Sequence, residues 1–204
     1  MGINSLKLKL LSVFVAFVLV FGIMPVAPVH AATTVAASNT SSLETFIASL
    51  SKADSSKLIG VFIKNILAVP VVQQSSTYSV SSKAGTVTQF GLASQSGSIG
   101  LLAHNYLSGS KFSKLQSGTE IFLVYGDGST KKFTVSNTKK YQTLKPTDPF
   151  SDFINLDNPD TILSSSSVFD TIYGSGGNLI FQTCIRKNGN SSWGIMFVTA
   201  SPAN

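Results

Sequence analysis

The sequence predicts a mostly β domain, either a barrel or a sandwich. Short apolar stretches rich in Val, Ile, Phe and Thr recur along the chain, and Gly, Asn, Ser and Pro separate them. Only 12% of the 204 residues are charged while 43% are hydrophobic, a balance that excludes a disordered chain and a coiled coil. The length suits one domain with a short appendage.

The first 31 residues have the layout of a secretory signal peptide. Two lysines precede an apolar run at 10–24, and the small residues Val29 and Ala31 predict cleavage after Ala31. The run is shorter than the ~20 residues that a membrane-spanning helix needs, although the segment up to Val29 extends it. The sequence therefore predicts an exported protein, secreted or at the cell surface. The alternative is an uncleaved N-terminal membrane anchor.

Residues 32–57 are expected to form a linker and one short helix. Small and polar residues dominate 32–42, and they offer too little apolar surface to pack. Ser41 and Glu44 form a capping box, and the apolar residues after them at helical spacing predict a helix at about 42–52.

Turn residues then divide the chain into short elements. In chain order, we expect two strands within 58–74 that turn at Lys64 and Asn65, a hairpin over 119–144 that turns at 126–128, short helical turns at 150–156 and 161–174, and two strands at 178–185 and 193–200 joined by the polar turn 186–192. Few helices among many strands are typical of a barrel or sandwich.

Cys184 is the single cysteine of the chain, and His104 is the one histidine that remains after the predicted cleavage. Each follows an apolar run, as a residue at a strand end near a barrel rim would. A thiolate attacks carbonyl carbon, and an imidazolium lowers the pKa of the thiol and then protonates the leaving amine. The alternatives are a buried small hydrophobic residue or an intermolecular disulfide for Cys184, and a structural role for His104.

Arg186 is the single arginine of the chain and lies two residues after Cys184. On a continuing strand, its side chain would share a face with the sulfur and reach the oxyanion that develops on the attacked carbonyl. If the strand ends at Ile185, Arg186 is a solvated turn cation instead.

The segments GLLAHNY around His104, FQTC around Cys184 and the later WGIMFVTA resemble the sortases, cysteine transpeptidases of the bacterial cell surface. The resemblance covers roughly 58–200 and includes the order His, Cys, Arg. It implies an eight-stranded β-barrel domain with short helices over 58–204. It also implies that Cys184 attacks the Thr carbonyl of a sorting signal such as LPXTG, that His104 is the acid and base, and that an amine or water resolves the acyl-enzyme.

The resemblance further implies that Asn105, Thr183 and Ile195 lie in the substrate-binding site. One position departs from the family pattern, because the family arginine belongs on the last strand, where Ile195 stands. Either Arg186 replaces it, or backbone N–H groups stabilise the oxyanion, or the copy is weakened. The alternative function is a noncatalytic secreted β-barrel that binds peptide or glycan in the same groove.

Other ligands have little support in the sequence. The lysine pairs at 131–132 and 139–140 lack interleaved aromatic residues and an arginine cluster, so no nucleic-acid partner is expected despite the net charge of +6. Asp148, Asp152, Asp157 and Asp160 lack the alternating spacing of a calcium loop, and one His with one Cys is too few for zinc. We therefore predict no metal and no cofactor.

Overall fold

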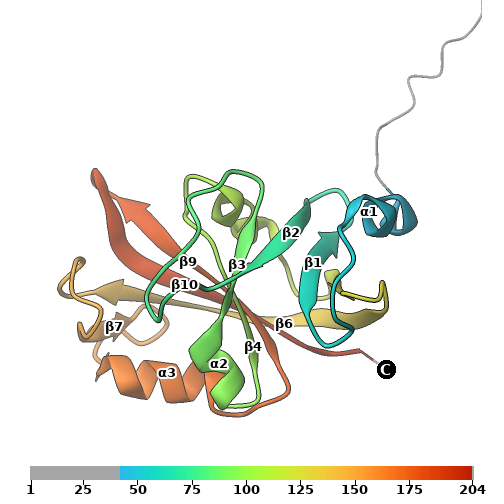
Figure 1. The fold of residues 1–204 in the computed structure, drawn as a ribbon. Coiled ribbons are helices and arrows are strands. Elements are labelled where there is room, and N and C mark those ends of the chain that lie inside the picture. Colours follow the sequence, from blue (N-terminus) through green and yellow to red (C-terminus); the bar gives the residue numbers. More distant parts are fainter. Residues whose placement is uncertain (1–41, 204) are drawn as a thin grey trace, which may run out of the picture. The chain divides into compact units, whose positions relative to one another are not determined.

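A computed structural model describes residues 42–203, in which ten strands form one sheet (Figure 1). In chain order these are β1 (Leu58–Ile63), β2 (Leu67–Gln73), β3 (Val87–Phe90), β4 (Ile99–Leu102), β5 (Glu120–Tyr125), β6 (Thr130–Thr143), β7 (Phe153–Asn155), β8 (Ile162–Leu163), β9 (Leu179–Lys187) and β10 (Asn190–Pro202). The helices are α1 (Leu43–Ser49), α2 (Gly91–Gln95), the 3-10 helix η1 (Ser108–Lys114) and α3 (Ser165–Tyr173).

The sheet closes on itself through the long strand β6. The strand order is β10-β9-β4-β3-β2-β1-β5-β6-β7-β8, and β10 pairs with β6 as well. The start of β6 pairs with β5 and its later part pairs with β10, so one continuous strand joins the two ends of the ring. Eight strands therefore form a closed barrel, and β7 and β8 extend from its edge. The predicted eight-stranded barrel with short helices is confirmed.

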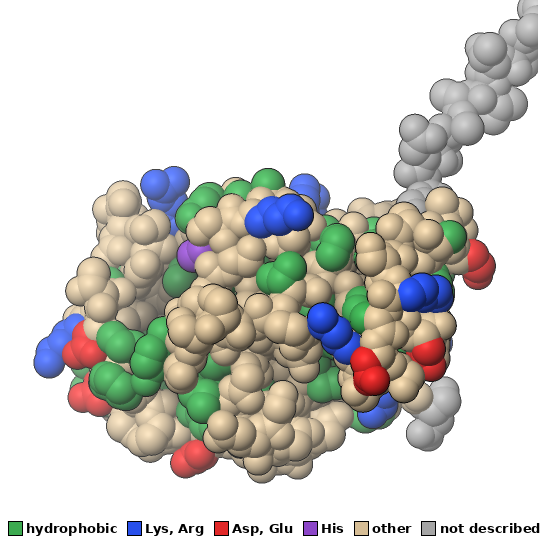
Figure 2. Space-filling model, in the orientation of Figure 1, with side chains coloured by type: hydrophobic (Ala, Val, Ile, Leu, Met, Phe, Trp, Pro, Cys, Tyr) green, Lys and Arg blue, Asp and Glu red, His purple; other side chains and the backbone are tan. Residues whose placement is uncertain are grey.

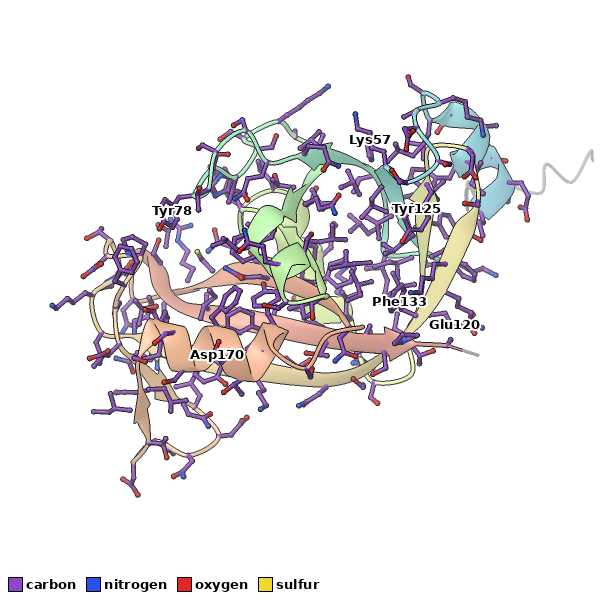
Figure 3. All side chains as sticks on the ribbon, turned by 60° about the horizontal axis from the view of Figure 1, so that its bottom comes forward. Lys57, Tyr78, Glu120, Tyr125, Phe133 and Asp170 are labelled. Carbon is purple, nitrogen blue, oxygen red and sulfur yellow. The ribbon has the colours of Figure 1, made fainter. Side chains whose placement is uncertain are left out.

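The inside of the barrel is filled by apolar side chains that alternate along each strand. Phe181 of β9 and Phe112 of η1 lie fully buried there, edge to face with ring centroids 5.0 Å apart. Figure 3 shows Phe133 of β6 among the inward side chains, while Glu120 lies at the outside. This core fixes the positions of β4 and β9.

The outer faces of β9 and β10 are also covered. Ile180 and Phe197 point away from the barrel core and pack against Tyr173 of α3 and Ala93 of α2. Figure 1 shows α3 and α2 side by side below these strands, and α1 at the other end of the barrel. Because both faces of β9 are buried, its register is strongly specified.

The first hairpin follows the prediction, and the first helix forms where it was expected but with different ends. β1 and β2 turn at Lys64–Ile66, where Asn65 has the left-handed φ of 63° that a tight turn needs. The helix is shorter than expected, because α1 ends at Ser49. Its N-cap is Ser42, whose hydroxyl accepts from the Thr45 N–H at 3.2 Å, rather than the expected Ser41.

Two expectations near the C-terminus need correction. Residues 150–156 are not a helical turn, because β7 pairs with the end of β6 and Phe153 packs edge-on against Tyr141. Segment 161–174 begins with β8 before α3, which Ser164 caps by accepting from the Ser167 N–H at 3.1 Å. Both strands form because β7 pairs with the edge of β6 and β8 pairs with β7. The local amino-acid composition of a segment does not reveal such a long-range contact.

The turn between the last two strands is much shorter than 186–192. Asn188 and Gly189 alone form it, with positive φ angles of 50° and 79°, the conformation of a two-residue hairpin turn. As a result β9 continues to Lys187, and Cys184 lies within the strand rather than at its end.

The predicted signal peptide, its cleavage site and nearly all of the linker lie outside the described residues. Within residues 42–203, no helix is long and apolar enough to cross a membrane.

The barrel core generates a stability prediction. Replacing Phe181 by Ala removes a fully buried ring, so we expect a loss of about 3–5 kcal/mol in the free energy of unfolding. Phe150→Ala, at a ring that is 69% exposed, is the matched control and should change it by under about 1 kcal/mol. Urea denaturation of both variants measures this, and equal losses would contradict the description of the core.

Candidate active site

Three adjacent strands bring the candidate residues together. β4 and β9 are parallel, with Gly100 beside Ile180 and Leu102 beside Gln182. The Ala103 N–H continues this ladder to the Gln182 carbonyl at 3.3 Å. The Thr183 hydroxyl donates to the Ala103 carbonyl at 2.8 Å, so the residues directly before Cys184 and His104 are in contact. Segments 80 positions apart in the sequence therefore meet just after the end of β4.

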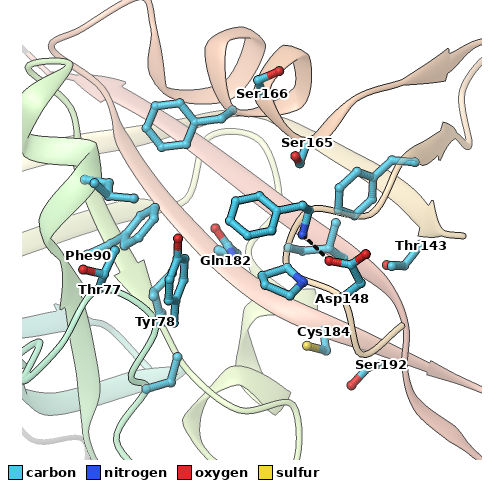
Figure 4. A pocket seen from close by; sticks show the side chains of 18 of the residues that line it. Thr77, Tyr78, Phe90, Thr143, Asp148, Ser165, Ser166, Gln182, Cys184 and Ser192 are labelled. Atoms are coloured by element: carbon cyan, nitrogen blue, oxygen red, sulfur yellow. Dashed lines mark hydrogen bonds between the residues drawn. The ribbon is translucent and has the colours of Figure 1, made fainter. Parts of the chain in front are cut away.

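A cavity of about 610 Å³ lies on the outer face of β9 and β10 (Figures 2 and 4). Cys184 and Gln182 line it from β9, and Ser192, Gly194 and Ile195 line it from β10. Figure 2 shows the hollow in the left half of this face, with hydrophobic side chains along its border and charged side chains mostly at the periphery.

Two loops and two helices form the remaining walls. Tyr78, from the loop after β2, and Phe150, from the loop after β6, meet edge to face with ring centroids 6.3 Å apart. The Phe150 N–H donates to the Asp148 carboxylate at 2.9 Å, which stabilises its loop (Figure 4). Asp148 and Asp170 are the charged side chains among the described lining residues. Most of the other lining residues are apolar or uncharged, so the cavity is suited to a largely apolar ligand segment.

The sulfur of Cys184 is half-buried in this wall. Burial raises the pKa of the Cys184 thiol above its ordinary value, while a hydrogen bond with the Ser192 hydroxyl acts in the opposite direction. The thiol is therefore largely neutral near pH 7. Attack on a carbonyl requires a base that removes its proton.

Gln182, two residues before Cys184, presents an amide donor to the cavity. The Tyr173 hydroxyl donates to the Gln182 Oε1 at 2.7 Å. Burial raises the pKa of Tyr173, so this hydroxyl stays protonated and fixes the orientation of the amide. Within residues 42–203 the Gln182 Nε2 has no protein acceptor, and it is not a buried unsatisfied atom. The amide N–H groups are therefore free to bind a carbonyl in the cavity.

His104 is not among the residues that line the cavity. Its ring stacks on the exposed ring of Tyr106, with centroids 5.1 Å apart and planes 15° from parallel. Gly109 packs closely on the backbone that follows β4, where a Cβ would collide with Thr183 and with the Ala103 and His104 carbonyls. The turn carrying His104 is thus held tightly against β9.

Arg186 and Ile195 occupy different places relative to Cys184. Ile195 is the direct cross-strand partner of Cys184 and lines the same cavity. Arg186 continues β9, so strand alternation gives it the same side as the sulfur, but it is exposed and outside the cavity lining. No ion pair of Arg186 occurs within residues 42–203.

Asn105 and Thr183 contact backbone rather than the cavity. The Asn105 Nδ2 donates to the Ser191 carbonyl at 2.8 Å and so ties the turn after β4 to β10. Thr183 is buried on the barrel side, and its hydroxyl donates to the Ala103 carbonyl at 2.8 Å. Thr183 is not among the residues that line the cavity, and its side chain holds β4 against β9.

The comparisons with known proteins bear on this arrangement. Neither the protein-family models nor the curated proteins give a match to the chain. Among solved structures, it resembles sortase C-1 from Actinomyces oris with a TM-score of 0.50 and 16% identity, over 78% of this chain and 79% of that one. The chain has a sortase fold.

Two other sortases show the same likeness. Sortase A from Corynebacterium diphtheriae gives a TM-score of 0.46 at 15% identity over 74% of this chain, and Streptococcus agalactiae sortase C1 gives 0.49 at 14% over 75%. The sortase-fold chain spans 63% of the Corynebacterium sortase and 70% of the Streptococcus one. At these identities the likeness concerns the fold, so the chemistry of this sortase-fold protein is argued from its own residues.

Sequence reasoning missed several residues of the cavity. Gln182 was within reach, because alternation along a strand places residues i and i+2 on one face. Ser192, Tyr78 and Phe150 had no such signal, since an irregular hairpin and two loops place them. Within residues 42–203, no three side chains of the metal-ligating types gather, and the four aspartates considered for calcium are not brought together.

The raised pKa of Cys184 predicts slow alkylation at neutral pH. The thiolate is the reactive form, so the rate of iodoacetamide modification should keep rising above pH ~8.5, the ordinary pKa of a cysteine. Mass spectrometry measures the rate, and Cys184→Ser should give no labelling because the chain has a single cysteine. A rate that is already constant at pH 7 would contradict the predicted shift.

Proposed function

We propose that this sortase-fold protein is an exported cysteine transpeptidase that acts on a peptide sorting signal at the cell surface. Cys184 is the nucleophile and His104 the acid and base. The observation that supports the proposal is the contact of Thr183 with Ala103, which brings together the segments that carry Cys184 and His104, beside a cavity that Cys184 lines. The signal-like segment 1–31 supports export.

The proposed reaction proceeds through an acyl-enzyme. His104 takes the thiol proton, and the sulfur electron pair forms a bond to the carbonyl carbon of the peptide while the C=O π pair moves to oxygen. Collapse of this intermediate breaks the C–N bond, and the amine leaves with the proton from His104. An amine or water then attacks the thioester, which restores the thiol.

The cavity supports a peptide as substrate. An extended peptide exposes backbone carbonyls, and the free amide N–H groups of Gln182 offer donors for one of them beside Cys184. Ile195 and Phe150 supply apolar surface for a side chain of the signal. Asn105 contributes by holding the turn that carries His104 against β10.

A second function is favoured by one observation, namely that Ile195 rather than an arginine faces Cys184. A noncatalytic barrel would use the same cavity to bind peptide or glycan without covalent chemistry. The two functions differ in what Cys184→Ser does, because binding alone needs no nucleophile.

Incubation with a sorting-motif peptide tests the enzymatic proposal. We expect mass spectrometry to find an acyl adduct on Cys184 of the full chain. The adduct should be absent in Cys184→Ser, and it should form about 10²–10⁴-fold more slowly in His104→Ala, which lacks the acid and base.

Tyr106→Phe is the matched control for His104→Ala. It keeps the ring on which His104 stacks, so the adduct should form at close to the wild-type rate. A wild-type protein that binds the peptide without any adduct, with unchanged affinity in Cys184→Ser, would contradict the enzyme and support the binding barrel.

Arg186 remains a proposed contact for the developing oxyanion, and a charge-matched pair of variants tests it. Arg186→Ala should slow adduct formation by about tenfold or more, because a positioned donor to the oxyanion is lost. Lys187→Ala removes the same charge from the neighbouring residue, which alternation places on the other face of β9. Equal rates in the two variants would show that Arg186 acts only as a surface cation.

A further inference from the structure

The hairpin of β9 and β10 is irregular directly beside the sulfur. Lys187 pairs with Asn190 and Ile185 pairs with Gly194, so three residues of β10, 191–193, oppose the single residue Arg186. A bulge of this kind redirects side chains locally. Here it turns Ser192 into the cavity that Cys184 also lines (Figure 4), near enough for the hydroxyl to oppose the rise in the pKa of the thiol.

Two hydrogen bonds keep the bulge in one conformation. The Ser192 N–H donates to the Asn190 Oδ1 at 2.9 Å, which closes a tight turn at the base of β10. The Asn105 Nδ2 donates to the Ser191 carbonyl at 2.8 Å, which links the bulge to the turn after β4. Ser192 is therefore held in the cavity wall by these two contacts, one of which comes from the residue after His104.

The cross-strand partner of Cys184 cannot donate a hydrogen bond, because it is Ile195. A thiolate in a half-buried, largely apolar wall needs a donor, and so does the oxyanion that follows it. The Ser192 hydroxyl has one proton, so it serves one acceptor at a time. Formation of the C–S bond removes the charge from sulfur and places it on the carbonyl oxygen, which then becomes the stronger acceptor.

We propose that Ser192 is the positioning donor of this site, holding the Cys184 thiolate before attack and turning to the substrate oxygen once the C–S bond has formed. The inference rests on the proposed acyl transfer and assigns to a β10 hydroxyl the donor role that Ile195 cannot fill. The electron pair moves from sulfur to carbon and from the C=O π bond to oxygen, and Ser192 keeps its proton throughout.

The pH profile of Cys184 alkylation by iodoacetamide tests the first half of this role without any peptide. Ser192→Ala and Ser192→Val should shift the profile to higher pH and lower the rate at pH 7 by about tenfold, because a hydrogen bond to a charged group is lost. Ser192→Thr keeps the hydroxyl and should retain the wild-type profile. Since Val and Thr have nearly the same shape, this pair separates the hydroxyl from packing even where Ser192→Ala fails to fold.

The other titratable groups near the sulfur are the same in all of these Ser192 variants. Asp148 and Asp170 line the cavity from the loop after β6 and from α3, while His104 follows β4 and Arg186 continues β9. Ser165→Ala, at a serine of α3 that lines the cavity elsewhere, is the control and should leave the profile unchanged. These residues therefore do not account for a shift seen only in Ser192→Ala and Ser192→Val.

The peptide adduct measures the second half of the role. At a pH where the thiol of each variant is fully ionised, Ser192→Val should still form the adduct more slowly than Ser192→Thr. Superimposable alkylation profiles for wild type, Ser192→Ala and Ser192→Val would overturn the inference. Absence of a wild-type adduct together with the expected profiles would overturn the proposed acyl transfer instead, so the two failures are distinguishable.

Discussion

The parallel pairing of β4 with β9 is the constraint on which the candidate site depends. Parallel strands carry their side chains in step, so the pairs Gly100–Ile180 and Leu102–Gln182 determine what lies beyond them. A shift by one residue would turn Cys184 into the barrel core and Thr183 into the cavity. The buried Phe181 on one face and Ile180 on the other make such a shift costly, because each would lose its apolar partners.

Closure of the barrel positions the second strand of the candidate site, β10. β10 must pair with β9 to place Ile195 opposite Cys184, and it is held there because β6 pairs along most of its length. β6 is therefore more than a hairpin partner of β5. It joins the core to the strand that forms the second wall beside the sulfur.

Local patterns were sufficient where a short segment decides its own conformation. Lys64 and Asn65 predicted the first turn, and two apolar runs separated by a polar segment predicted the last two strands. They were insufficient where distant packing decides, as at β7, which forms a strand because the end of β6 offers an edge and Tyr141 offers a ring for Phe153. The short Asn188-Gly189 turn was hidden in a longer polar segment, and with it the continuation of β9 through Arg186.

The apolar walls of the cavity are the reason why the site needs hydrogen-bond donors. Walls such as Ile195 and Phe150 favour an apolar ligand but also disfavour charge, which is why burial keeps the Cys184 thiol neutral. A site of this kind works only if charge, once formed, meets a donor that is already in place, since reorganisation of an apolar wall supplies none. Ser192 can be that donor because the bulge of β10 holds it in the cavity wall. Regular alternation of side chains along the strand would not predict this position.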